Sequence, residues 1–273
     1  MTMRTRLGRL VCGLAGGVAA AALALGAVPA SAETFKLGIV TFLSGQAAEA
    51  FGVPAANGAK TMIAGLNAGQ LPAPYATKGF GGLEIQPVII DEAGGATKQV
   101  QELRNLIQRE QVDAVVGYIS SGDCLAVGPV AEELKALLIL FDCGTPRIFE
   151  DNKFSYVFRT AAHATMDNVG LVRYLKDHDV KINTFSGINQ DYAWGHDSRN
   201  DFVAAMGQLY PEAKFIHIMR DPRDVVASQL RMPWINDCYL LRARSWRRLV
   251  QSAGHWSEML GPGRWLDLRY EDV

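Results

Sequence analysis

Short apolar segments that alternate with helix-patterned segments place the strongest constraint on how this chain can fold. Residues 35–42 (FKLGIVTF) and 83–90 (LEIQPVII) are short and rich in β-branched side chains, which is typical of buried strands. Strand and helix patterns alternate in steps of about 25–30 residues, which predicts an α/β fold with a parallel sheet and helices on both faces. We expect strands at 35–42, 83–90, 112–118, 138–141 and 182–187, and helices at 47–66, 97–110, 123–137, 169–178 and 198–209.

Residues 1–32 have the pattern of a secretory signal peptide. Three arginines precede a Gly- and Ala-rich apolar run, and residues 30–32 offer an A-x-A cleavage site. The alternatives are a buried helix or a membrane anchor, which the cleavage site disfavours. We therefore expect export to the periplasm, with no stable membrane insertion after the signal is cleaved.

The bulk composition narrows the class of protein. Hydrophobic residues make up 49% of the chain and charged residues 20%, which is typical of a folded globular protein. The formal net charge is -1, so the chain as a whole has no electrostatic attraction to nucleic acid. We expect no nucleic-acid partner.

Three cysteines remain after signal cleavage: Cys124, Cys143 and Cys238. Export implies an oxidising compartment, in which disulfides persist. Cys124 and Cys143 each follow a predicted strand, and the ends of neighbouring parallel strands meet at one edge of a sheet. A Cys124–Cys143 disulfide is therefore predicted, with two buried thiols as the alternative.

The carboxyl ends of the predicted strands are where an open α/β sheet binds its ligand. This rule selects Ser44-Gly45, Asp91, residues 120–122 and residues 143–145. The serines at 120 and 121 begin a helix, where hydroxyl and backbone N–H groups can hold an anion; the alternative is that they only cap the helix. We expect Asp91 to be mainly a structural carboxylate. This part of the chain has no nucleophile elbow, phosphate loop or HExxH motif, which favours binding over catalysis.

Several segments, taken in order, resemble the type I periplasmic binding proteins, and most closely the leucine/isoleucine/valine receptors of ABC importers. The resemblance covers about residues 33–213 and rests on GIVTFLSGQAAEAFG, NGAKTMIAGLNAG, VIIDEAG, VDAVVGYISSGDCLAVGPVAEEL, LFDCGTP and YVFRTAA. It implies a Rossmann-like amino-terminal lobe (33–160) and the start of a truncated second lobe (161–213), which close on a small ligand. It also implies two partners, an amino acid or amide and a membrane permease, and no cofactor.

The resemblance assigns ligand contacts in the first lobe. Ser121, with Ser120 beside it, matches a serine that binds the ligand's carboxylate. Thr145 and the carbonyl of Cys143 match groups that orient the α-amino group. The alternative for Thr145, which precedes Pro146, is a turn residue.

The resemblance also assigns aromatic contacts. Trp194 matches an aromatic side chain that the second lobe places over the ligand, and Tyr192 is close enough to take that role instead. Phe51 is expected to wall the pocket for the ligand's side chain. Ordinary packing is the alternative for Trp194.

The composition changes near residue 214. All nine lysines lie at or before Lys214, and nine arginines but no lysine follow it. From about residue 211 the sequence resembles a PAPS-dependent sulfotransferase, on the segments PEAKFIHIMRDPRDVVASQL and GRWLDLRYEDV. Arg220 and Ser228 match that family's site for the nucleotide 3′-phosphate, where a guanidinium and a hydroxyl suit a phosphate group.

The sulfotransferase resemblance covers only about residues 211–273, which we call the tail and bound at 214–273 as a domain. The family's phosphosulfate loop does not precede it, so we expect the tail to be inactive and its phosphate site vestigial. The two resemblances meet at 210–215, which favours a fusion of unrelated coding sequences, by recombination or by an assembly error. Three readings follow: a receptor impaired by fusion, a sulfotransferase-related fragment that uses PAPS, and a non-functional chimera.

Overall fold

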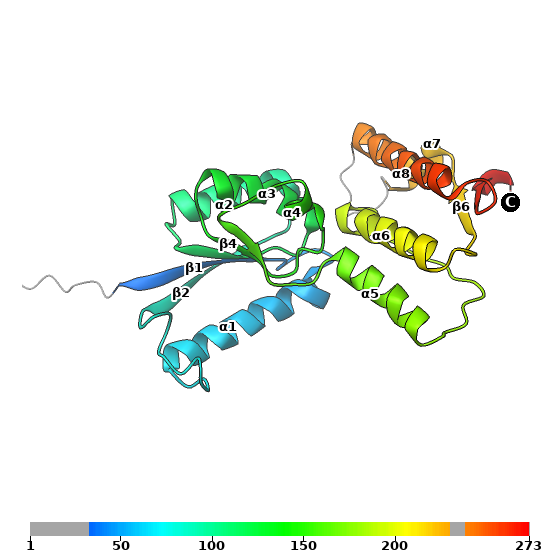
Figure 1. Cartoon of the computed structure of the whole chain (residues 1–273). Helices are drawn as coiled ribbons and strands as arrows, with labels where there is room; N and C mark the ends of the chain where they lie inside the picture. Colours follow the sequence, from blue (N-terminus) through cyan, green and yellow to red (C-terminus); the bar gives the residue numbers. More distant parts are fainter. Residues whose placement is uncertain (1–32, 230–237, 273) are drawn as a thin grey trace, which may run out of the picture. The chain divides into compact units, whose positions relative to one another are not determined.

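The computed structural model describes residues 33–229 and 238–272. The predicted signal peptide at 1–32 lies outside the described residues. Within these residues, the chain first forms one sheet with its helices and then a second, smaller group of helices and strands (Figure 1).

The first part of the chain forms a five-stranded sheet in which every neighbouring pair is parallel. The strand order is β2-β1-β3-β4-β5. The predicted parallel α/β fold is therefore confirmed. The bounds are β1 (Thr34–Thr41), β2 (Glu84–Asp91), β3 (Ala114–Gly117), β4 (Leu138–Leu140) and β5 (Val157–Arg159).

Helices cover both faces of this sheet (Figure 1). On one face, Ile39 and Ile85 pack with Ile63 of α1. On the other, Val40 joins Leu103 of α2 in the larger core, because successive side chains of a strand point to opposite faces. The bounds are η1 (Ala48–Gly52, a π-helical turn), α1 (Val53–Ala68), α2 (Gly95–Gln108), α3 (Ser121–Glu133) and α4 (Arg147–Glu150).

In the remaining described residues, two helices that precede residue 214 pack against elements of the tail. Val172 of α5 and Met206 of α6 share a small core with Phe215 of β6. Strands β6 and β7 pair in parallel, apart from the five-stranded sheet. The bounds are α5 (Ala164–Asp177), α6 (Ala193–Leu209), β6 (Phe215–Met219), α7 (Pro222–Gln229), α8 (Tyr239–Leu260), β7 (Trp265–Arg269) and η2 (Tyr270–Asp272).

The strand predicted at 182–187 is wrong, because these residues form no strand. A strand needs a partner, and β6 takes β7 as its neighbour in the smaller sheet. Phe185 instead contributes its ring to the core, at centroid distances of 5.3 Å from Phe202 and 5.9 Å from Phe215. The segment is thus held by the packing of Phe185 and not by the strand hydrogen bonds that its β-branched pattern predicted.

Candidate ligand site

The predicted anion site at the start of α3 lies beside a buried carboxylate. Glu92, directly after β2, is fully buried and accepts backbone N–H groups of Ile119 (2.9 Å) and Ser120 (2.7 Å). These amides are therefore already engaged. Glu92 was not among the predicted site residues, although its place just after a predicted strand end could have drawn attention to it.

The two serines at this helix start have different roles. The Ser120 hydroxyl caps α3 by accepting the backbone N–H of Asp123 at 3.3 Å. The Ser121 hydroxyl is fully buried and accepts the backbone N–H of Thr145 at 3.1 Å. The structure thus links Ser121 and Thr145, two of the predicted ligand contacts, at the carboxyl ends of β3 and β4.

Thr145 connects the end of β4 to α6. Its hydroxyl donates to a carboxylate oxygen of Asp197 at 2.6 Å. The guanidinium of Arg159 donates to the carbonyl oxygens of Thr145 (2.6 Å) and Cys143 (3.0 Å). A ligand that uses these groups would have to take over hydrogen bonds that the protein makes to itself. Neither Asp197 nor Arg159 was predicted from the sequence, because no local pattern marks partners that lie 52 and 14 residues away from Thr145.

Cys124 and Cys143 form a disulfide in this structure, with their Cα atoms 6.3 Å apart. Both side chains are fully buried. The bond ties the first turn of α3 to the loop after β4, so it holds the segments that carry Ser121 and Thr145 next to each other.

The start of α6 covers the loop after β4. A Cβ atom added to Gly144 would overlap the indole of Trp194, so this close approach requires glycine. The Gly144 carbonyl also accepts the backbone N–H of Ala164 at 2.8 Å. Tyr192 lies nearby, with its ring centroid 6.4 Å from that of Trp194. Trp194 thus meets the predicted site directly.

Two other predicted positions lie at the last residue of β2 and on η1. Asp91 accepts the Ser44 hydroxyl at 2.6 Å and the Leu43 N–H at 2.9 Å, as expected of a structural carboxylate. Burial acts to raise its pKa, but these hydrogen bonds outweigh burial and the pKa is lowered. Phe51 is 55% exposed on η1, and its role as a pocket wall stays a prediction.

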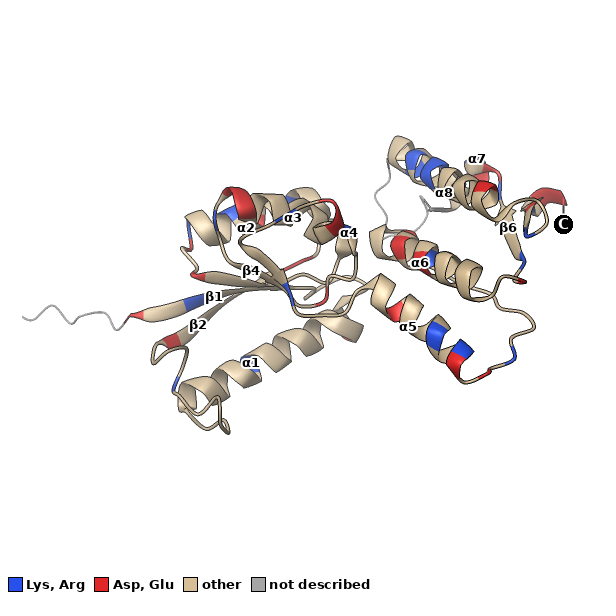
Figure 2. Ribbon diagram, in the orientation of Figure 1, with Lys and Arg blue, Asp and Glu red and all other residues tan. Residues whose placement is uncertain are grey.

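The electrostatics of the site are dominated by acidic groups. Burial raises the pKa of Glu92 to about 8, against the lowering effect of its two backbone hydrogen bonds. Burial also raises the pKa of Asp123 to about 6. Tyr192 has its pKa raised to about 12 by burial and by the nearby carboxylates of Asp142 and Glu92. Figure 2 shows acidic residues along α6 as well. A carboxyl group with a pKa of about 8 is mainly protonated at pH 7, so Glu92 adds little negative charge to the site.

The predicted phosphate site in the tail has an acidic neighbour. The Arg220 guanidinium lies 3.9 Å from the Asp224 carboxylate and 5.3 Å from the centroid of the Tyr270 ring. Ser228 is exposed on α7. An anion would compete with Asp224 for the arginine, so these residues fit a nucleotide phosphate poorly.

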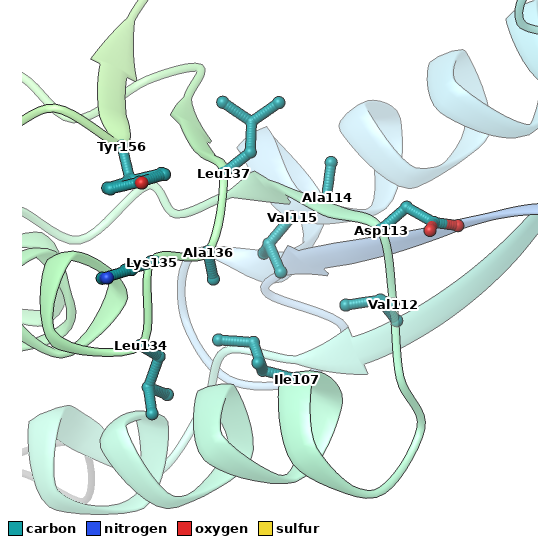
Figure 3. A pocket seen from close by; sticks show the side chains of 10 residues that line it. All are labelled: Ile107, Val112, Asp113, Ala114, Val115, Leu134, Lys135, Ala136, Leu137 and Tyr156. Atoms are coloured by element: carbon teal, nitrogen blue, oxygen red, sulfur yellow. The ribbon is translucent and has the colours of Figure 1, made fainter.

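A shallow hollow of about 280 Å³ lies at the amino ends of β3 and β4, away from the candidate site (Figure 3). Its walls are mainly apolar, as at Ile107, Leu134 and Leu137. The Asp113 carboxylate at this end accepts the backbone N–H of Lys36 at 2.7 Å. The hollow therefore lacks the converging polar groups of a ligand site.

Residues 33–229 and 238–272 offer neither a cluster of metal ligands nor a membrane-spanning helix. In these ranges no three His, Cys, Asp or Glu residues are grouped so that they could hold a metal ion. No helix within them is long and apolar enough to cross a bilayer.

A parallel α/β lobe with its polar site at the strand ends defines a class of small-ligand-binding folds. The family model for periplasmic binding proteins matches residues 34–214. The chain belongs to the periplasmic binding protein family. The model of the sulfotransferase family matches residues 180–273, so the two matches overlap at 180–214. No curated protein matches the chain.

Solved structures show the same fold. The leucine-, isoleucine-, valine-, threonine- and alanine-binding protein from Brucella ovis is 22% identical over 65% of this chain and 45% of its own, with a TM-score of 0.53. A leucine-binding protein from Thermotoga maritima is 20% identical over 65% of this chain and 47% of its own, with a TM-score of 0.50. A solute-binding protein from Rhodopseudomonas palustris in complex with 3,4-dihydroxybenzoic acid is 20% identical over 65% of this chain and 44% of its own, with a TM-score of 0.52. The chain thus spans less than half the length of these relatives.

Proposed function

We propose that the chain is a solute-binding receptor of an ABC importer, acts in the periplasm, and binds a branched-chain amino acid or a related amide. In this proposal, residues 33–160 form the first lobe, 161–213 begin the second, and 214–273 form the tail. The ligand would be passed to a membrane permease.

One observation carries the proposal: the buried Ser121–Thr145–Asp197 connection. It joins the strand ends of the first sheet to α6 at 3.1 Å and 2.6 Å. An amino acid carries a carboxylate and an ammonium, which complement a serine at a helix start and an aspartate. The leucine receptors among the solved relatives support this ligand class, and the benzoate-binding relative supports the competing one.

Isothermal titration of the mature chain, residues 33–273, with leucine, valine, their amides and 3,4-dihydroxybenzoate tests the proposal. Thr145→Val removes the hydroxyl but keeps the shape of the side chain. We expect it to weaken leucine binding by about fivefold, since one hydrogen bond contributes about 1 kcal/mol. Thr160→Val, at an exposed threonine, is the matched control. If wild-type protein binds none of the amino acids or amides, the proposal fails.

The tail is proposed to be inactive as a sulfotransferase, which rests on the pairing of Arg220 with Asp224. Titration with PAPS in parallel tests this: tight PAPS binding that Arg220→Ala abolishes would favour the sulfotransferase reading.

A further inference from the structure

Helix α6 carries one wall of the candidate site, and the tail contacts this helix along its whole length. Trp194 and Asp197 lie in its first turns, where they meet Gly144 and Thr145. If α6 shifts, this wall shifts with it. The groups that fix α6 therefore bear on ligand binding.

The amino-terminal end of α6 is fixed by the start of α8. The Ser245 hydroxyl donates to a carboxylate oxygen of Asp191 at 3.2 Å. The same oxygen lies 3.0 Å from Nε2 of His196, in the first turn of α6. The loop that leads into the wall is thus connected to a tail residue.

The middle of α6 is fixed by two tail donors that meet one acceptor. The side-chain oxygen of Asn200 accepts the Ser252 hydroxyl at 3.0 Å and the Trp256 indole N–H at 3.2 Å. All three residues are partly buried. Asn200 lies three residues beyond Asp197, less than one helical turn, so this contact is close to the wall along the helix axis.

The carboxyl end of α6 is capped by the tail. The Arg264 guanidinium donates to the carbonyl oxygens of Gly207 (3.3 Å), Tyr210 (3.1 Å) and Ala213 (2.9 Å). A cation at this position also interacts favourably with the helix dipole. From 245 to 264 the tail contacts thus advance along α6 in the same direction as the helix.

The receptor's own helix α5 holds another part of α6. Asn168 donates to the Ser198 hydroxyl at 2.9 Å, and the Thr165 hydroxyl donates to Asp201 at 2.9 Å. These contacts join receptor to receptor. Asn200 makes its contacts elsewhere: its side-chain oxygen accepts the neighbouring Arg199 guanidinium at 3.4 Å, and the tail supplies its other two donors from α8.

We propose that Ser252 and Trp256 of the sulfotransferase-family tail are positioning residues for ligand binding, because they hold α6 against the strand ends of the first sheet. The inference rests on the proposed receptor function. It assigns the tail a part in the receptor's site that does not depend on any chemistry of its own.

A double variant, Ser252→Ala with Trp256→Phe, tests this without changing any receptor residue. The variant loses the two hydrogen-bond donors of the tail, the Ser252 hydroxyl and the Trp256 indole N–H, but keeps an aromatic ring at position 256 and most of the packing. We expect leucine to bind about three- to tenfold more weakly, and amides 193–201 to exchange with solvent about tenfold faster. The amides of β1 and β3 should exchange as in wild-type protein. Gln251→Ala, at an exposed position on α8, is the matched control and should change neither readout.

The outcomes separate the two proposals. If wild-type protein binds no amino acid or amide, the proposed function fails. If wild-type protein binds leucine and the double variant binds it equally well, the function stands and the positioning role is wrong. Faster exchange throughout β1 and β3 would also overturn the inference, because it would indicate a general loss of stability.

Discussion

The region from β1 to β5 and the region from α5 to η2 are held together in different ways. The first buries a continuous core in which Val40, Leu103, Leu138 and Leu140 are fully enclosed. The second has a small core around Met206, and many of its contacts are hydrogen bonds between α6 and the tail. Apolar burial contributes more to stability than single neutral hydrogen bonds, so the first region should be the more stable.

The difference is also visible at the surface. On the second sheet, Ile216 and Ile218 are 65% and 58% exposed, and Leu266, paired with Ile216, is 51% exposed. The first sheet carries helices on both of its faces. One region thus has a complete layered fold, whereas the other leaves one face of its sheet in contact with water.

The largest effect is expected from a cavity in the first core. Leu140→Ala should lower the free energy of unfolding by about 3 kcal/mol, because the side chain is fully buried. Leu266→Ala, on the exposed face of the second sheet, should cost less than about 0.5 kcal/mol. Urea unfolding followed by circular dichroism measures both. Equal losses would contradict the contrast between the regions.

Loss of the disulfide should come next. Cys124→Ala with Cys143→Ala should destabilise the first region by about 3 kcal/mol, as expected for a loop of this length, since 19 residues separate the cysteines. Hydrogen exchange of β3 and β4 measures the loss. Dithiothreitol should raise the exchange rates of wild-type protein to those of the double variant, and it should not change the rates of the double variant. An effect of the reductant on the double variant would show that the loss of stability has another cause.

Glu92 should make the first region less stable at high pH. Its folded pKa of about 8 lies above the value of 4.5 for an ordinary glutamate, so the folded state binds the proton more tightly. Stability is then full below pH 4.5 and falls as the pH rises through 8, by an amount on the order of a few kcal/mol.

Glu92→Gln tests this pH dependence in urea unfolding at pH 5, 7 and 9. The side-chain oxygen of glutamine can still accept the backbone N–H groups of Ile119 and Ser120 but does not titrate. The stability of the variant should therefore fall much less between pH 5 and pH 9 than that of wild-type protein. Glu133→Gln, at an exposed carboxylate paired with Arg104, is the control and should keep it. A wild-type stability that rises toward pH 9 would show that the sign is wrong.

Removal of the cap on α6 should affect only the second region. Arg264→Met keeps the apolar stem and loses the hydrogen bonds to three carbonyls, at a cost of about 1–2 kcal/mol. All five tryptophans lie at or after Trp194, so their fluorescence reports mainly this region, although Trp194 also contacts Gly144 of the first region. Arg269→Met, at an exposed arginine on β7, is the control. An equal change in the exchange of β1 would indicate that the two regions unfold together.

The smallest effect on stability is expected at the uncovered sheet face. Ile216→Thr with Ile218→Thr keeps β-branched side chains and should change the free energy of unfolding by less than about 0.5 kcal/mol. Light scattering should show less self-association, because an apolar patch is removed. A loss above about 1 kcal/mol would mean that this face is covered in solution.

Sequence reasoning was most successful where the signal is local. The strand and helix pattern predicted the parallel sheet, and strands β1 to β4 lie within about two residues of their expected bounds. The segment at 182–187 had the same β-branched composition but forms no strand, because Phe185 packs into the small core and β6 pairs with β7. Composition indicates that a segment can be a strand; only its neighbours decide whether it is.

The site shows the same limit. Strand ends and helix starts led to Ser121 and Thr145, which the structure links by a hydrogen bond. Asp197 and Arg159 were missed, because their roles depend on contacts across the fold. The carboxylate of Glu92 could have been suspected from its place after β2, but its burial could not.

The overlap of the two family matches at 180–214 includes the whole of α6. One side of this helix contacts α5 and another contacts α8, and both sides find hydrogen-bonding partners. In the terms of protein engineering, α6 acts as a joint: a single helix that satisfies two neighbours at once, within a segment that both family models match. Grafting other folds onto a binding-protein lobe could use the same joint, with an acceptor at position 200 and a capping arginine for the last turn.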